Sequence, residues 1–344
     1  MGNKMADMNF YCNVLDFFCR KLSELQWFHS PRTFIDSLVN LQKIRLMKES
    51  SVRHIVVPDR NIFSRLINVI TKGNTKQGNI QDIATLISWC IMLNMDIWPY
   101  YALNELAAGT NSETNAQLEY SAFSKLYTEI DWFTWMALAM GCEKENKKIV
   151  VPAVFESETI FNVDSIDYLT NYASLLHFAY VWRTEKAAID RFKAFFQWYY
   201  DNLKVSRFME VYVCSVLSQS PDYRAPKNIN SSNLDNVIKG CKNQARDMSY
   251  LTALSIDRIP SDQYEMILVS DDKMLGNIFS SGCYNTRAIR TFEKNISNRN
   301  HQISEWVNTL LANHYEFITE DYSKHCQKII DNEIQRLKML FRSE

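Results

Sequence analysis

The chain has 344 residues, of which 47% are hydrophobic and 22% are charged, and its formal net charge is −1. This length suffices for one large or two ordinary globular domains. The balanced charge excludes a general positive field of the kind that attracts nucleic acid, so any basic surface must be local. Only 8 Gly and 7 Pro occur, which predicts long helices with few tight turns.

Targeting segments and metal-binding cysteine motifs are not apparent in the sequence. The N-terminal residues lack a charged segment followed by an apolar core, and no apolar run reaches the ~18 residues that a membrane helix needs. We therefore expect no signal peptide, no membrane span and a cytoplasmic location. The 8 Cys lack CxxC pairs and zinc-ligand spacing, so we expect reduced, buried thiols without a structural metal.

The first part of the chain predicts helices and then a buried strand. Residues 1–50 carry apolar side chains at helical spacing. The continuous β-branched run from His54 to Val57 is typical of a strand buried on both faces. A helical pattern follows, and Asp59 and Asn61 stand between the two. An Asp in this place is either a helix N-cap or a ligand, and Asn61 has the same two interpretations.

A second short strand is predicted near residues 96–101, and Glu105 opens the helix after it. A Glu in a first helical turn is also favoured by the helix dipole alone. The next part of the chain, about 110–235, carries almost only helical patterns. A locally basic segment there has two interpretations, a solvated helix face or a surface for phosphate backbones. Its basic residues are Arg183, Lys186, Arg191, Lys193, Lys204 and Arg207. The neighbouring Trp198-Tyr199-Tyr200 is either core or a base-stacking cluster.

The last predicted strand, Met266 to Val269, ends abruptly in Ser270-Asp271-Asp272. Two adjacent acids are not explained by core packing, and this edge of an open α/β sheet is where ligands usually bind. The preceding helix carries Asp247 in its middle, where Asp has poor helix propensity and no capping role. Helices that alternate with apolar strands predict a parallel sheet with crossover helices.

The acids could form one site if a cation compensates for their charge. Two carboxylates ~4 Å apart repel by roughly 4 kcal/mol at an effective dielectric constant near 20. Oxygen ligands without His or Cys suit Mg²⁺ or Mn²⁺, which activate water for phosphodiester hydrolysis. The sequence contains none of the motifs of P-loop proteins, dinucleotide-binding folds, serine hydrolases or zinc proteases.

The order of these residues resembles that of the PIN-domain family. An Asp-x-Asn follows the first strand, a Glu opens the helix after the second, an Asp lies on a later helix, and a Ser-x-Asp ends the last strand. The resemblance implies a three-layer α/β/α fold with a parallel sheet, similar to nuclease domains of the flap-endonuclease type. It also implies a Mg²⁺- or Mn²⁺-dependent endonuclease that acts on single-stranded nucleic acid, for which we expect RNA.

Carried over residue by residue, the resemblance assigns the site. The metal ligands and catalytic residues would be Asp59, Glu105, Asp247 and Asp272, with Asp271 as an additional ligand. Asn61 and Ser270 match polar positions beside the acids and would hold ligands or water by hydrogen bonds. The Ser-x-Asp pattern favours Asp272 over Asp271 as the ligand.

The resemblance covers residues 52–109 and 237–290, and the long separation between these segments departs from a minimal PIN domain. We therefore expect a PIN-like domain over 51–290 with a helical insertion at about 110–235. The segment 1–50 would precede this domain as helices.

The C-terminal segment, 291–344, is predicted to be helical, with an amphipathic last helix. It is expected either to pack on the domain or to bind a second copy or another protein.

Two other functions fit the same sequence. The first is a PIN-like module that binds RNA or protein without cutting, in which the acids cap helices or face solvent. The second is a Mg²⁺-dependent phosphatase-type hydrolase with Asp59 as nucleophile. The latter is disfavoured because its expected Asp-x-Asp is Asp59-x-Asn61 here.

Overall fold

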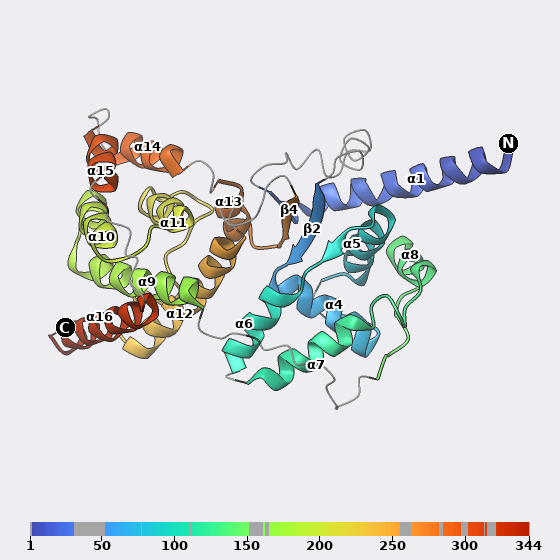
Figure 1. Cartoon of the computed structure of the whole chain (residues 1–344), viewed down its shortest axis with the longest axis horizontal. Coiled ribbons are helices and arrows are strands. Elements are labelled where there is room, and N and C mark those ends of the chain that lie inside the picture. The colour runs from blue at the N-terminus through green and yellow to red at the C-terminus, as the bar shows by residue number, and fades with distance from the viewer. Residues whose placement is uncertain are drawn as a thin grey trace. The chain divides into compact units, whose positions relative to one another are not determined.

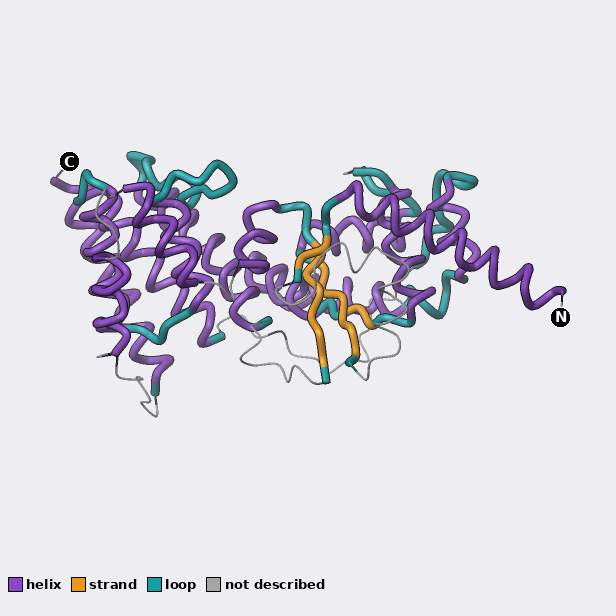
Figure 2. The backbone as a smooth tube through the Cα atoms, turned by 90° about the horizontal axis from the view of Figure 1, so that it is seen from above, coloured by secondary structure: helices purple, strands orange, loops and turns teal. Residues whose placement is uncertain are grey.

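The structure, a computed structural model, shows a mixed α/β protein with one small sheet (Figures 1 and 2). The chain divides into two compact units, which we describe separately. Unit 1 consists of Met1–Val163 and Ile256–Gly276, and unit 2 of Asp164–Ser255 and Asn277–Glu344. The residues described are 2–30, 52–76, 78–110, 112–150, 161, 165–254, 263–281, 285–296, 302–312, 314 and 321–343.

The sheet of unit 1 has four strands in the order β1-β4-β2-β3 among the residues described. Their bounds are β1 (Phe28–His29), β2 (Arg53–Pro58), β3 (Asp96–Ile97) and β4 (Tyr264–Val269). β2 pairs in parallel with both β3 and β4, which confirms the predicted strands and their crossover connections. The expectation of an entirely parallel sheet was wrong, because β1 follows a long N-terminal helix and joins β4 in the antiparallel sense.

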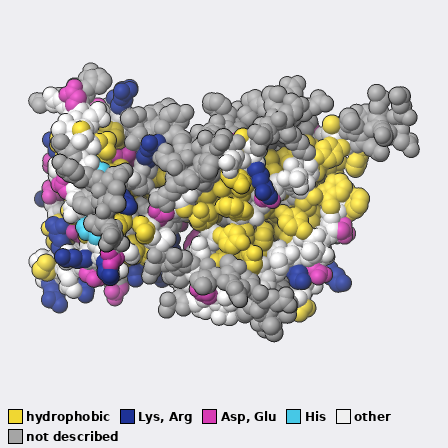
Figure 3. Space-filling model, in the orientation of Figure 1, with side chains coloured by type: hydrophobic (Ala, Val, Ile, Leu, Met, Phe, Trp, Pro, Cys, Tyr) yellow, Lys and Arg dark blue, Asp and Glu magenta, His cyan; other side chains and the backbone are white. Residues whose placement is uncertain are grey.

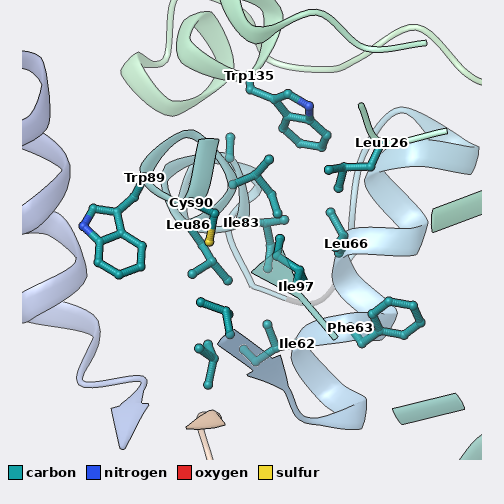
Figure 4. Packing of buried hydrophobic residues seen from close by; sticks show 14 of the residues in the cluster. Ile62, Phe63, Leu66, Ile83, Leu86, Trp89, Cys90, Ile97, Leu126 and Trp135 are labelled. Carbon is teal, nitrogen blue, oxygen red and sulfur yellow. The ribbon is translucent and has the colours of Figure 1, made fainter. Parts of the chain in front are cut away.

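The helices of unit 1 form a core with one face of this sheet. Their bounds are α1 (Gly2–Leu25), α4 (Arg60–Lys72), α5 (Ile80–Leu93), α6 (Tyr100–Thr110), α7 (Glu113–Ser124) and α8 (Trp132–Met140). In Figure 4 the buried side chains of α4 and α5 face one another, and Trp89 extends towards α1. Trp89 also packs on Phe28 of β1, with ring centroids 5.0 Å apart. The three-layer arrangement stays a prediction.

Within its described residues, the secondary-structure elements of unit 2 are helices joined by loops and turns. Its helices are α9 (Ile166–Thr184), α10 (Ala188–Asn202), α11 (Arg207–Leu217), α12 (Leu234–Ala253), α14 (Asn285–Ile296), α15 (Gln302–Ala312) and α16 (Tyr322–Ser343). α13 (Lys273–Ser281) begins in unit 1 and ends in unit 2. α9 is buried over most of its length, because α12 and α16 both pack against it.

The two units differ from the predicted domain boundaries. α7 and α8 lie within the expected insertion at about 110–235, yet they belong to unit 1. α12 lies after the expected insertion but belongs to unit 2. The C-terminal helices also pack with unit 2, since α16 contacts α9 and α12. Helical patterns alone could not show which helices share a core.

The aromatic segment Trp198-Tyr199-Tyr200 is part of the core of unit 2. Tyr199 and Tyr200 are buried, and Trp198 stacks on His177 with ring centroids 3.8 Å apart. The rings of Tyr199 and Tyr200 are therefore core side chains and are not available to stack on bases.

Two arginines of the neighbouring basic segment have structural partners. Arg183 donates to the carbonyl oxygen of Ile229 at 3.1 Å, and Arg191 donates to that of Glu185 at 2.8 Å. Both guanidinium groups therefore already bind backbone carbonyl oxygens.

The free thiols only partly match the expectation of burial. Cys19, Cys90, Cys214, Cys241 and Cys326 are buried, whereas Cys12 and Cys142 are exposed. Among the described helices, none combines the length and the apolar character needed to cross a membrane. In Figure 3, hydrophobic side chains gather on the visible face of unit 1, and charged side chains lie mostly around them.

Candidate functional site

The candidate site lies where β2 and β4 end side by side. The register pairs Pro58 with Val269, and the N–H of Asp59 donates to the carbonyl oxygen of Val269 at 2.9 Å. Asp59 and Ser270 therefore leave the sheet at the same edge. Parallel pairing of two strands predicts this meeting, because their carboxyl ends lie together.

Asp59 is buried, with 6% of its surface exposed, and it connects the two strand ends. One carboxylate oxygen accepts a hydrogen bond from the N–H of Ile62 at 2.8 Å, which caps the N-terminus of α4. The other accepts a hydrogen bond from the Ser270 hydroxyl, which is itself buried. The capping role of Asp59 is thus confirmed, whereas its role as a metal ligand stays a prediction.

The environment of Asp59 disfavours its negative charge. Burial raises the pKa of this carboxyl group to about 6, and the charge of Asp271 acts in the same direction. Hydrogen bonds from Ile62 and Ser270 and the charge of Arg65 lower the pKa, but they do not outweigh burial. A positive charge bound at this edge would therefore stabilise the ionised form.

The two adjacent acids after β4 have different partners. Asp272 accepts hydrogen bonds from the N–H groups of Met274 at 2.8 Å and Leu275 at 3.2 Å, so it caps the first turn of α13. Its own N–H donates to the Ser270 hydroxyl oxygen at 3.0 Å. Asp271 instead forms an ion pair with Arg65 of α4. Ser270 thus joins Asp59 to Asp272, and Arg65 holds Asp271 beside them.

His29 is a neighbour of this edge that the sequence analysis missed. Its Nε2 lies 3.4 Å from the carbonyl oxygen of Ser270, and its ring is buried. Burial lowers the pKa of His29, while Ser270 and the charge of Asp272 act against that shift. The ring fits because Gly276 has no side chain, since an added Cβ would lie 2.1 Å from the imidazole Cε1. A lone Gly within a helical pattern was the available signal.

A second missed contact links the site to α7. Arg60, the first residue of α4, donates to both carboxylate oxygens of Glu119, at 2.5 and 2.8 Å. Both side chains are largely buried, so this two-point contact fixes the start of α4 against α7.

The remaining predicted site residues lie on three different helices. Glu105 is half-buried on α6, and Asn61 is exposed on the first turn of α4. Asp247 lies on α12 of unit 2. The pKa of Tyr212 is raised mainly by burial, and the charges of Cys241 and Asp247 make smaller contributions in the same direction. The structure therefore brings together Asp59, Ser270, Asp271 and Asp272, and the roles of Glu105, Asn61 and Asp247 stay predictions.

The donor atoms of the residues at the strand ends suit a hard cation, whereas their arrangement does not form a ready metal site. Their donors are all oxygens, as Mg²⁺ and Mn²⁺ prefer. Within the ranges that the structure describes, however, no three His, Cys, Asp or Glu side chains are arranged to hold a metal ion. Asp59 uses both carboxylate oxygens in hydrogen bonds. Binding of an ion would thus require these side chains to accept an additional contact or to shift.

Comparisons of the chain with protein-family models, with curated proteins and with solved structures found no match. The features of the chain that bear on function are therefore its short sequence motifs and the edge of the sheet at which Asp59, Ser270, Asp271 and Asp272 meet.

Proposed function

We propose that unit 1 is a Mg²⁺- or Mn²⁺-dependent nuclease that hydrolyses phosphodiester bonds of single-stranded nucleic acid, with RNA as the expected substrate. One observation carries the proposal. Three carboxylates, those of Asp59, Asp271 and Asp272, gather at the carboxyl ends of two parallel strands, and Ser270 joins the two strand ends. This edge is where α/β proteins place ligands.

The electrostatics of the cluster favour a bound cation. The pKa of Asp59 is raised to about 6 by burial and by Asp271, so this carboxylate lacks a full compensating charge. Arg65 supplies one positive charge, but it is paired with Asp271. A divalent ion would compensate for the remaining negative charge.

Each residue has a role in the proposed site. Asp59, Asp271 and Asp272 would hold the ion, which would supply an activated water and stabilise charge on the phosphate. Ser270 fixes the orientation of Asp59 and, through its hydroxyl oxygen, the backbone of Asp272. Glu105 would bind the ion directly or through a water molecule, and Asn61 would hold a water molecule by a hydrogen bond. Asp247, which the resemblance also predicts as a ligand, lies on α12 of unit 2 and has no role in the site proposed for unit 1.

Cleavage of labelled single-stranded RNA and DNA by the full chain tests the proposal. We expect cleavage with Mn²⁺ or Mg²⁺, none with EDTA, and a loss of more than about 100-fold in Asp272→Asn, since even indirect supports of metal ligands cost 10–100-fold. Asn also caps helices well, so folding should persist. Asp131→Asn is the matched control, because Asp131 caps α8 through the N–H of Thr134.

Retained metal-dependent cleavage in a purified Asp59→Asn, Asp272→Asn double variant would contradict the assignment. A phosphomonoester in the same assay addresses the phosphatase alternative. Hydrolysis of that substrate without cleavage of oligonucleotides would favour it.

A second candidate function is a PIN-like module that binds RNA or protein without cutting. The observation in its favour is that Asp59 and Asp272 both have hydrogen bonds as helix caps. Calorimetric titration with Mn²⁺ distinguishes the candidates. If the parent protein binds Mn²⁺ and Asp272→Asn does not, the result supports the nuclease. If the parent protein binds no Mn²⁺ up to millimolar concentration, the result supports the non-catalytic module.

A further inference from the structure

Two short segments of unit 1 bring a set of lysines together. The end of α4 and the loop after it lie against residues 144–149 through backbone hydrogen bonds. The N–H of Asn146 donates to the carbonyl oxygen of Gly73 at 2.7 Å, and that of Ile149 donates to Ile70 at 3.1 Å. Gly73 permits this approach, because its φ of 79° is left-handed and an added Cβ would lie 2.3 Å from the Asn146 oxygen.

The lysines of these segments are exposed and share one region. They are Lys72, Lys76, Lys144, Lys147 and Lys148. The acids Glu143 and Glu145 lie in the same stretch, so the lysines outnumber the local acids. In the part of the chain that the structure describes, none of the five lysines forms an ion pair. In a chain of net charge −1, this is a local positive field.

A hollow of about 640 Å³ lies beside the first of these segments. Each of its described lining side chains carries a hydroxyl, amide or ammonium group. The lining residues are Ser64, Asn68, Lys72, Asn74, Thr75 and Lys76. Inside it, Lys72 Nζ donates to Asn68 Oδ1 at 2.5 Å. Hydroxyls, amides and ammonium groups are the donors that contact phosphate and sugar oxygens in nucleic-acid complexes.

We propose that this hollow and the five lysines bind the phosphate backbone of a single-stranded nucleic acid. The number of positive charges suits several phosphates of one strand better than one small anion. The side chains that line the hollow all carry polar groups, whereas a protein lying on a membrane inserts side chains of an apolar face. The proposal rests on the proposed function only for the statement that the bound strand is also the one that is cut.

The position of α4 relates the hollow to the candidate site. This helix begins next to Asp59 and ends at Lys72, and its 13 residues make it about 20 Å long. A strand held at the hollow would therefore extend over several nucleotides before it reached the carboxylates. The C-terminus of a helix repels anions, and the lysines outweigh that effect here.

Aromatic rings at the other end of α4 favour an unpaired strand. Beside Glu119, the partner of Arg60, Tyr120 lies 5.9 Å from Tyr100 between ring centroids, and Tyr100 lies 6.4 Å from Trp98. Trp98 and Tyr100 are 39% and 38% exposed. Exposed rings offer faces on which unpaired bases stack.

Binding measured in EDTA tests the proposal separately from cleavage. The probe is a fluorescein-labelled oligouridine of about 12 nucleotides, within the usual range of single-strand site sizes. For the full chain with Lys144→Glu, Lys147→Glu and Lys148→Glu, we expect at least about tenfold weaker binding. The slope of log K against log salt should fall by about 2, at ~0.7 per phosphate contact. Trp98→Ala should weaken binding by about tenfold without changing this slope.

The matched control changes the same charge on unit 2, with Lys294→Glu, Lys328→Glu and Lys338→Glu, all at exposed positions. Equal losses in the two triple variants, or no binding by the unmodified protein, would overturn the proposal. So would lysine-dependent binding to phosphatidylserine vesicles with RNA binding unchanged. Lysine-dependent RNA binding without cleavage in Mn²⁺ would support this proposal and contradict the proposed nuclease.

Discussion

Asp59 of unit 1 and Glu333 of unit 2 are both buried carboxylates, and they are compensated in different ways. In unit 2, Glu333 lies 3.0 Å from the Nδ1 of His177 and 2.8 Å from the guanidinium of Arg336. Burial raises the pKa of Glu333, but His177 and Arg336 outweigh it, so the pKa is lowered. In unit 1, Asp59 has hydrogen bonds from uncharged donors and an acid nearby, and its pKa is raised.

The difference indicates which carboxylate is structural. Burial of a charge is costly unless a partner compensates it. Arg336 on the same helix supplies the compensating charge for Glu333, and His177 of α9, whose pKa burial lowers, supplies a hydrogen bond, so Glu333 holds two helices together. Asp59 lacks such partners at the edge of a sheet where ligands bind, so its environment suits a group that receives a cation. Three experiments test this difference and the packing around the site.

The largest effect on stability is expected at Glu333. Glu333→Gln removes the charge that pairs with Arg336, at a cost of about 3 kcal/mol, the lower end for buried ion pairs, because Arg336 is 39% exposed and water stabilises its charge. Urea unfolding followed by circular dichroism measures this cost. The control is Asp331→Asn on the same helix, an exposed residue that should change stability by less than about 0.5 kcal/mol. Equal effects would show that Glu333 has no special structural role.

The next effect concerns the pH dependence of stability through Asp59. Burial raises its pKa from 3.8 to about 6, so the folded protein binds this proton more tightly than the unfolded chain does. The free energy of unfolding should therefore fall as pH rises from about 4 to about 6, by up to about 3 kcal/mol.

Asp59→Asn removes this contribution, so the variant should gain stability relative to the parent protein as pH rises through that window. Urea titrations at several pH values measure it. At pH 7, Mn²⁺ should raise the free energy of unfolding of the parent protein and leave that of Asp59→Asn unchanged. An ion that binds the folded state stabilises it. Identical pH slopes for the two proteins would contradict the raised pKa.

The smallest effect is expected at Gly276. A Cβ there would lie 2.1 to 2.3 Å from three atoms of the His29 ring, and overpacking of this kind costs about 1–3 kcal/mol. The helix preference of Ala recovers about 1 kcal/mol of that cost. Thermal unfolding of Gly276→Ala measures the net loss.

Gly109→Ala is the matched control, because nothing lies within 4 Å of its added Cβ and stability should rise slightly. His29→Ala should relieve the clash in the double variant. A Gly276→Ala protein as stable as its parent would show that His29 is not held against α13.

Local patterns in the sequence were sufficient for β2, β3 and β4 and for the cap at Asp59, whereas β1 lies in the segment 1–50 that was expected to be helical. The β-branched run of β2 and the apolar run of β4 formed strands, because such side chains fit a sheet buried on both faces. Asp59 became the N-cap of α4, because its carboxylate satisfies a free backbone N–H of the first turn. The meeting of Asp59 with Ser270 followed from the parallel pairing of these strands.

The contacts that define the site's environment could not be derived in this way. Arg65 with Asp271, Arg60 with Glu119, and His29 with Ser270 join residues far apart in the chain. Such pairs depend on how helices pack, and no local propensity determines them. The same reason explains why the helical pattern around Asp247 did not show that α12 shares its core with α9 and α16.

The ends of β2 and β4 and the acids that follow them could thus be predicted from the sequence, because these features depend on neighbouring residues and on backbone preferences. Which charges meet depends instead on the tertiary fold. It paired Glu333 with His177 and Arg336, and it placed Asp59 beside Ser270 and Asp271 at the sheet edge. The charge state of a buried group depends on all the atoms around it, and the fold brings those atoms from distant parts of the chain.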